Sequence, residues 1–308
     1  APLLTHMMLT STARCVAIHS PLGRGSGSSR RCGAKGSRGG RTPVARCAAS
    51  SSESPPRLPR STQEQAAQAA AAVKRAALAG KSSVAVEFQL PLIGATDLDD
   101  WPGGVRQQYQ AVAPMVGDFL KGIVVDGRLD IKQRVVEDGD AVVVLSSGDA
   151  DAMVFLTAET LPELKSLAAE KKSGVLAIVN SQIRNDDGSN FISDLGIGPW
   201  KKRNEEFLSR FEQVYWLSEQ RIKGETIRLL KAYPHPWQLY VLTDMSDSSA
   251  QPECIQVYAE KPSYKELEAL LISRPGSVAA MDIFERVKRE GQFNASSLSK
   301  PPNNIDQK

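Results

Sequence analysis

Hydrophobic and polar residues follow two different periods along the chain, and together these periods predict a domain of mixed helices and strands. Residues 62–79 are rich in Ala and Gln and lie between Ser61 and Gly80. Ser is a common N-cap and Gly a common residue just after a helix end, so we predict a helix there. Over residues 84–90, large apolar side chains alternate strictly with Ala85, Glu87 and Gln89, which predicts a strand with one face in the core.

Short apolar runs further along the chain predict strands that are buried on both faces. Such runs occupy residues 141–145, 152–156 and 175–179. Between the second and third run, residues 160–172 have a helical pattern that ends before Gly174. A strand, a helix and a strand with short connections form a βαβ unit, so at least part of the sheet is predicted to be parallel.

The remaining elements complete one domain. We predict helices over residues 105–123 (kinked or split by Pro114), 201–216, 264–273 and 277–291, and strands over 129–135, 226–230, 237–243 and 254–258. The fold class is therefore α/β: a single three-layer domain over residues 61–293, with a partly parallel mixed sheet and an antiparallel extension. Residues 48–60 are predicted to be a linker and residues 294–308 a flexible tail.

The first 47 residues have a composition of their own. They hold eight of the 38 basic residues of the 308-residue chain and none of its 35 acidic residues, and they are rich in Ser and Gly. This composition is typical of an organelle transit peptide, and Val44-Ala45-Arg46-Cys47-Ala48 fits a stromal processing site. We therefore predict a chloroplast protein. The alternative is a basic tail that binds RNA, but the mildly acidic remainder of the chain has no general attraction for nucleic acid.

Few residues of the processed chain have the chemistry of a catalytic site. Cys254 and His235 are its only cysteine and histidine, and no glycine-rich phosphate loop follows a predicted strand. Asp97, Asp99 and Asp100 are weak candidates for a metal site, although aspartates also favour loops for local reasons. We expect no catalytic residue, no metal and no cofactor. The alternative is a nucleotide- or phosphoester-binding enzyme or sensor that uses Mg²⁺ and loop carboxylates.

Two polar and aromatic tracts are the candidate partner-binding residues. They comprise Trp101, Gly103, Gly104, Arg106 and Gln107 in the first tract and Tyr233, His235 and Trp237 in the second. Trp and Tyr are frequent in binding hot spots but are equally suited to a core, so both interpretations stay open. The basic run 201–203 allows peripheral contact with anionic lipid at most, and a solvated helix face explains it as well.

Four segments carry a resemblance to a known family: VAVEFQLP at 84–91, DWPGGVRQ at 100–107, IVNSQ at 178–182 and YPHPW at 233–237. In this order, they resemble a plastid and cyanobacterial family of domains of unknown function, which includes the third plant protein named for Low Photosystem II Accumulation. The resemblance implies a stromal or thylakoid-associated protein that helps to assemble photosystem II through a thylakoid insertion machinery. It transfers no catalytic residue.

These observations lead to one functional expectation. We expect a non-enzymatic plastid accessory or assembly factor that acts by protein binding. Its expected partners are subunits of photosynthetic complexes or thylakoid insertion and assembly factors.

Overall fold

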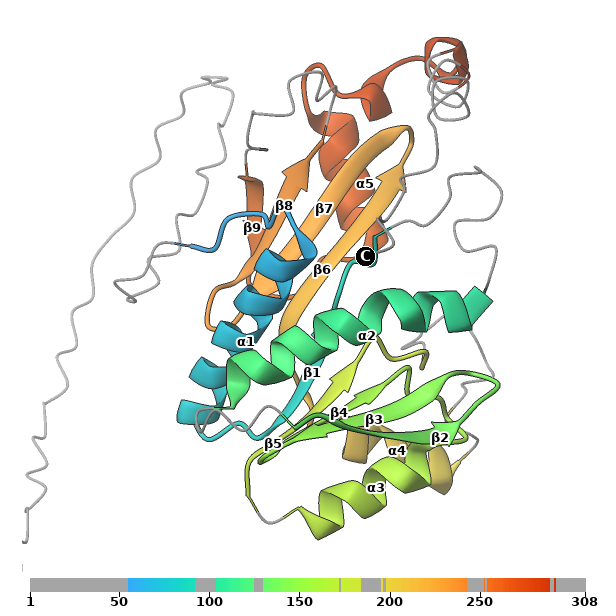
Figure 1. Ribbon diagram of the computed structural model, residues 1–308. Helices are drawn as coiled ribbons and strands as arrows, with labels where there is room; N and C mark the ends of the chain where they lie inside the picture. Colours follow the sequence, from blue (N-terminus) through green and yellow to red (C-terminus); the bar gives the residue numbers. More distant parts are fainter. Residues whose placement is uncertain are drawn as a thin grey trace, which may run out of the picture. The chain divides into compact units, whose positions relative to one another are not determined.

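The computed structural model describes residues 55–91, 104–124, 130–171, 173–183, 195, 198–242, 252, 254–288 and 291, all of which belong to one compact unit, residues 49–308. The elements of this part are α1 (Thr62–Leu78), β1 (Ser83–Glu87), α2 (Gly104–Ile123), β2 (Lys132–Glu137), β3 (Val142–Ser147), β4 (Ala150–Val154), α3 (Leu161–Glu170), β5 (Val175–Val179), α4 (Pro199–Leu208), β6 (Glu212–Ile222), β7 (Glu225–Ala232), β8 (Trp237–Val241), β9 (Cys254–Tyr258), α5 (Tyr264–Ser273) and the 3-10 turn η1 (Val278–Ala280) (Figure 1).

The described strands form one nine-stranded sheet in the order β2-β3-β4-β5-β1-β6-β7-β8-β9. Its centre is parallel, because β4 pairs with β5, β5 with β1, and β1 with β6 in the same direction. Antiparallel strands extend the sheet on both sides of this centre. The structure therefore confirms an α/β fold with a partly parallel mixed sheet and an antiparallel extension.

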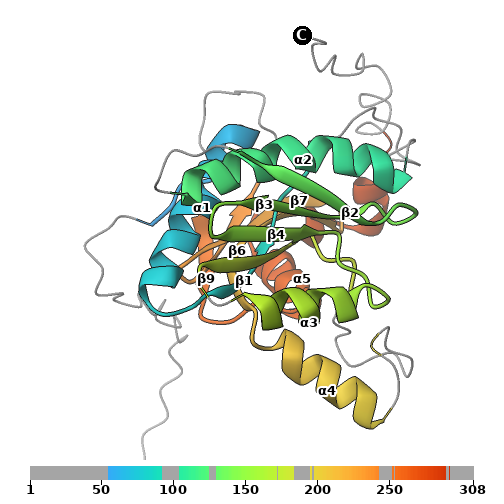
Figure 2. The same cartoon turned by 60° about the horizontal axis from the view of Figure 1, so that its bottom comes forward.

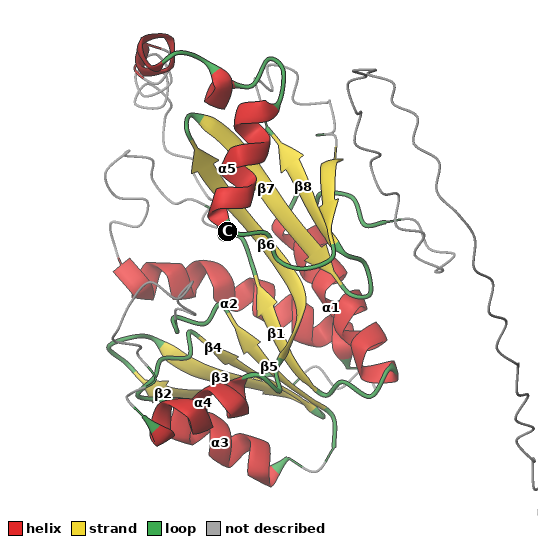
Figure 3. Cartoon of the chain, turned by 180° about the vertical axis from the view of Figure 1, so that it is seen from behind, coloured by secondary structure: helices red, strands yellow, loops and turns green. Residues whose placement is uncertain are grey.

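Helices cover both faces of the sheet (Figures 2 and 3). On one face, α1 and α2 enclose a core in which the Phe88 ring packs against Phe119 and Tyr215, with 6.0 Å between ring centroids in each pair. On the other face, α3 covers β3 to β5, and α5 covers β6 to β8. The strict alternation in β1 turns Val84 and Val86 toward α1 and α2 and leaves Glu87 on the opposite face.

The predicted helix over residues 201–216 is wrong in its second half. The helix α4 ends at Leu208, and after a three-residue turn the chain forms β6, the longest described strand. Tyr215 and Leu217 lie in the core against α1 and α2, whereas Trp216 lies on the other face. The apolar residues of this segment fit a helical period and a strand period about equally well, and pairing with β1 and β7 decides between them.

The other predicted elements are found close to their expected positions. The helix α2 continues through Pro114 without splitting, and Ser61 caps α1 by accepting a hydrogen bond from the Glu64 N–H at 3.1 Å. The predicted closing helix over 277–291 begins instead as the separate turn η1, with helical residues at 283–288. Among the described helices, none combines the length and hydrophobicity needed to cross a lipid bilayer.

Candidate functional site

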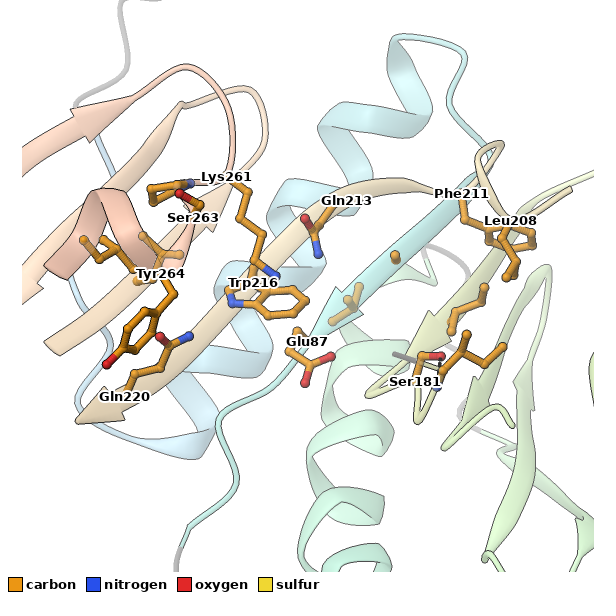
Figure 4. A pocket seen from close by; sticks show the side chains of 17 residues that line it. Glu87, Ser181, Leu208, Phe211, Gln213, Trp216, Gln220, Lys261, Ser263 and Tyr264 are labelled. Atoms are coloured by element: carbon orange, nitrogen blue, oxygen red, sulfur yellow. Dashed lines mark hydrogen bonds between the residues drawn. The ribbon is translucent and has the colours of Figure 1, made fainter. Parts of the chain in front are cut away.

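A pocket of about 710 Å³ lies on the face of the sheet opposite α1 and α2 (Figure 4). Its floor is the end of β1 together with β6. One wall is the first turn of α5 with the loop before it, and the other wall comes from β5, the residues after it, and the segment between α4 and β6. The second wall is apolar and is formed by Ile178, Ile183, Leu208 and Phe211.

The topology of the sheet explains the place of this pocket. The chain leaves β1 for α2 on one face, and it leaves the neighbouring strand β5 for α4 on the other face. Where connections from adjacent parallel strands diverge in this way, no helix covers the carboxyl ends of the strands, and ligands commonly bind there. Glu87 is the last residue of β1 and stands at this point.

The end of β1 is held in place by Asn180, the residue that follows β5. Its side-chain amide donates to the Phe88 carbonyl oxygen at 2.8 Å, and its amide oxygen accepts from the Phe88 N–H at 2.9 Å. Asn180 has a left-handed backbone with φ of 48°, which asparagine tolerates better than most residues. The Asn180 of the IVNSQ segment therefore has a structural role, and this role fixes the direction of the adjoining Glu87.

Glu87 is the acidic residue in the described lining of the pocket. Its carboxyl group has no hydrogen bond or ion pair within the described residues, although Lys261 is close enough to exert an electrostatic effect. Burial disfavours the charged form and raises the pKa of Glu87 to about 7, while the positive charge of Lys261 acts in the opposite direction. Near neutral pH this carboxyl group can therefore both donate and accept a hydrogen bond.

Trp216 lies directly opposite Glu87 in the register of β1 and β6. The Lys261 ammonium lies 3.7 Å from the centroid of the Trp216 ring, a close cation–π contact. The indole N–H donates to Ser218 Oγ at 2.8 Å, and the ring packs against Trp237 with 6.1 Å between centroids. The orientation of the Trp216 ring is thus fixed from two sides before any ligand arrives.

Most of the first predicted tract cannot be compared with the structure. Trp101 and Gly103 lie outside the described residues, as do the weak metal candidates Asp97, Asp99 and Asp100. Gly104 begins α2 with φ of 63°. Arg106 is exposed and forms an ion pair with Asp138 at 2.6 Å, and Gln107 is partly buried. Among the described residues, no group of three or more His, Cys, Asp and Glu side chains is placed to hold a metal ion.

The second predicted tract lies mostly inside the domain. His235 and Trp237 are only 5% and 3% exposed. The partly exposed Tyr233 accepts a hydrogen bond from Arg75 Nε at 3.0 Å through its carbonyl oxygen. Arg106 contacts the β2–β3 turn, whereas Tyr233 contacts the last turn of α1, so these two described residues of the tracts contact different parts of the domain. Trp237 does not line the pocket itself, but its ring packs against Trp216, which does.

Sequence reasoning missed the three residues that characterise the pocket. Glu87 lies in the alternating strand 84–90 and in the VAVEFQLP segment without a predicted role, and Trp216 lies in the predicted helix 201–216. A glutamate at the carboxyl end of a predicted parallel strand is a signal that could have identified the first. Lys261 gives no local signal, because its relation to Trp216 depends on how α5 packs on the sheet.

Replacing Glu87 with Gln should stabilise the protein above neutral pH. The unfolded chain ionises this carboxyl near its ordinary pKa of 4.5, but the folded protein does so only near 7. The wild type therefore loses stability as pH rises between these values, and Glu87→Gln does not. We expect the difference in unfolding free energy to grow from near zero at acidic pH to a plateau of up to about 3 kcal/mol. Urea denaturation across this pH range measures it, and equal pH profiles for both proteins would contradict the assignment.

Comparison with known proteins finds a match to one protein-family model and no match to an individual protein. No curated protein and no solved structure matches the chain significantly. A family model described as "Domain of unknown function (DUF1995)" matches residues 59–269, which run from just before α1 into α5. Every described residue that lines the pocket falls within this range. The chain belongs to the DUF1995 family.

Proposed function

We propose that this chain is a non-enzymatic plastid accessory factor that assists the assembly of photosynthetic complexes, as in photosystem II biogenesis, by binding a partner protein. The proposal rests first on the pocket at the carboxyl end of β1, where the Glu87 carboxyl group, which has no hydrogen bond or ion pair with a described residue, lies near an apolar wall. A side chain inserted by a partner segment could form a hydrogen bond or ion pair with this carboxyl group and pack against the apolar wall. The transit-like composition of residues 1–47 and the resemblance of four segments to a plastid and cyanobacterial family support the location.

The side chains of the pocket are better suited to binding than to chemistry. Its described lining contains one carboxyl group and no His or Cys. Covalent catalysis ordinarily requires a nucleophile within hydrogen-bond reach of a base, and within the described lining Glu87 forms no hydrogen bond with another titratable side chain. An apolar wall beside a few fixed polar groups is the usual composition of a binding site. These features favour capture of a partner over turnover of a substrate.

Affinity capture from a photosynthetic cell tests the proposal. The chain, tagged at its C-terminus, is recovered from solubilised thylakoids and stroma, and its partners are identified by mass spectrometry. We expect photosystem subunits or insertion factors with the wild type and none with Gln213→Trp, which places an indole in the pocket. The control Gln133→Trp adds the same group to an exposed position of the edge strand β2. Absence of such partners, or equal recovery with Gln213→Trp, would contradict the proposal.

The position of the pocket also favours a second candidate, a nucleotide- or phosphoester-binding enzyme or sensor that uses Mg²⁺. Sheets of this kind bind nucleotides where neighbouring connections diverge. A ligand that binds the folded protein raises its melting temperature with occupancy. A screen of nucleotides with and without Mg²⁺ therefore tests this candidate. A Mg²⁺-dependent rise in melting temperature would support it, and no rise would remove it.

A further inference from the structure

The corner formed by Trp216 and Glu87 has the composition of a site for organic cations. The two residues are direct neighbours across β1 and β6, and both line the pocket. An aromatic face next to a carboxyl group is the usual arrangement for binding an ammonium group. The ring is held in place by Ser218 and Trp237, so the site is already formed.

The chain places its own ammonium group at this corner. Lys261 lies 3.7 Å from the centroid of the Trp216 ring and lowers the pKa of Glu87 by its charge. Lys261 is an exposed residue of the loop between β9 and α5, and the buried Pro262 anchors that loop next to it. The long side chain can therefore leave the ring while the backbone of the loop stays in place.

We propose that the Trp216–Glu87 corner binds an alkylammonium or methylated ammonium group of a ligand, and that Lys261 occupies the site until that group displaces it. This proposal rests on the proposed function in one respect, that the cation belongs to the captured partner protein. Binding of a cation to the site can be tested separately from capture of that partner. Two sources carry this chemistry, a lysine side chain of a partner protein and a free organic cation.

The charges around the corner favour a cation over an anion. Among the described residues that line the pocket, Glu87 and Lys261 are the charged groups and Tyr264 is the other titratable side chain. An anion that paired with Lys261 would draw the ammonium away from the ring and would lie close to the Glu87 carboxylate. Lys231, opposite Trp216 on β7, has its ammonium over the Trp237 ring at 5.5 Å. A ligand cation, in contrast, replaces one favourable contact with another of the same kind.

Binding of choline to the full chain tests the site. Choline and its neutral isostere 3,3-dimethyl-1-butanol are titrated by calorimetry, and the Trp216 indole N–H is followed by NMR after assignment with Trp216→Phe. We expect choline to bind, to shift this signal and to exceed the isostere in affinity about tenfold. Binding should weaken from pH 8 to pH 6, because Glu87 then takes up a proton. Acetylated lysine methylamide, with and without trimethylation of the side chain, shows whether a lysine side chain binds better than the free cation.

Variants separate displacement from simple binding. Lys261→Met removes the competing ammonium and should tighten choline binding several-fold, whereas Glu87→Gln and Trp216→Leu should weaken it about tenfold. Lys265→Met, at an exposed position of α5, is the matched control and should change nothing. Equal binding of choline and its isostere, or no gain with Lys261→Met, would overturn the proposal. Choline binding with this pattern but without captured photosynthetic partners would uphold the site and reject the proposed function.

Discussion

Replacing Glu225 with Ala is expected to lower the free energy of unfolding by about 3–5 kcal/mol. Glu225 is the first residue of β7 and is only 1% exposed. Its Oε2 accepts hydrogen bonds from the Ser277 hydroxyl at 2.6 Å and from the Val278 N–H at 2.7 Å. The substitution leaves both donors buried without this acceptor, and each such loss costs about 1–3 kcal/mol. Urea denaturation measures the total effect.

The position of Glu225 links this prediction to the candidate site. Its hydrogen bonds with Ser277 and Val278 fix the segment after α5 to the sheet, and α5 forms a wall of the pocket. Hydrogen exchange in residues 264–280 should therefore accelerate in Glu225→Ala. Arg274→Ala is the control, because its guanidinium lies 3.8 Å from Glu225 and is partly exposed. We expect it to cost less than about 1 kcal/mol. A similar loss in both variants would show that the ion pair, and not the buried hydrogen bonds, anchors the segment.

Replacing Gly174 with Ala is expected to destabilise the protein by about 4 kcal/mol. Gly174 lies between α3 and β5 with φ of 82°, a conformation that costs other residues about 1–3 kcal/mol. A Cβ atom at this position would also lie 1.9 Å from the Asp149 carbonyl oxygen. That oxygen accepts a hydrogen bond from the Val175 N–H at 3.0 Å, so the start of β5 would have to move. The resulting overpacking adds about 1–3 kcal/mol.

Gly80 provides the matched control for this substitution. It has nearly the same backbone, with φ of 81°, but a Cβ atom there would meet no atom within 4 Å. Gly80→Ala should therefore show the backbone strain alone, about 1–3 kcal/mol. The difference between the two variants in chemical denaturation isolates the cost of the contact with Asp149. Equal losses would show that the chain near Gly174 shifts to accommodate the methyl group.

Local sequence patterns were sufficient for most of the elements. The apolar run at 175–179 and the helix at 264–273 match β5 and α5 at both ends. A short run that is apolar throughout predicts a central parallel strand, because helices cover both faces of such a strand and bury all of its side chains. Turn residues are also recognisable from local sequence. Lys223 and Gly224, with φ of 47° and 81°, form the tight turn between β6 and β7. The expected plastid location and assembly role remain proposals.

Residues 212–222 show where local patterns fail. Phe211, Val214 and Tyr215 fit a helical spacing, and no residue between Lys201 and Trp216 interrupts a helix. In the folded domain, β1 on one side and β7 on the other supply hydrogen-bonding partners for this segment. Such partners are distant in the sequence, so the gain from strand pairing is invisible to a local pattern.

By itself, the sequence determined the α/β class, the βαβ unit with its parallel strands, and the antiparallel strands after β6, because hydrophobic periodicity reports which face of each element is buried. Only the tertiary structure decided the site. Residues from Ala85 to Leu267 meet in one pocket, and the burial that raises the pKa of Glu87 comes from elements distant in sequence. His235 and Trp237 are likewise buried by elements that are distant in the sequence. Desolvation depends on everything that packs around a group, and that is a property of the fold.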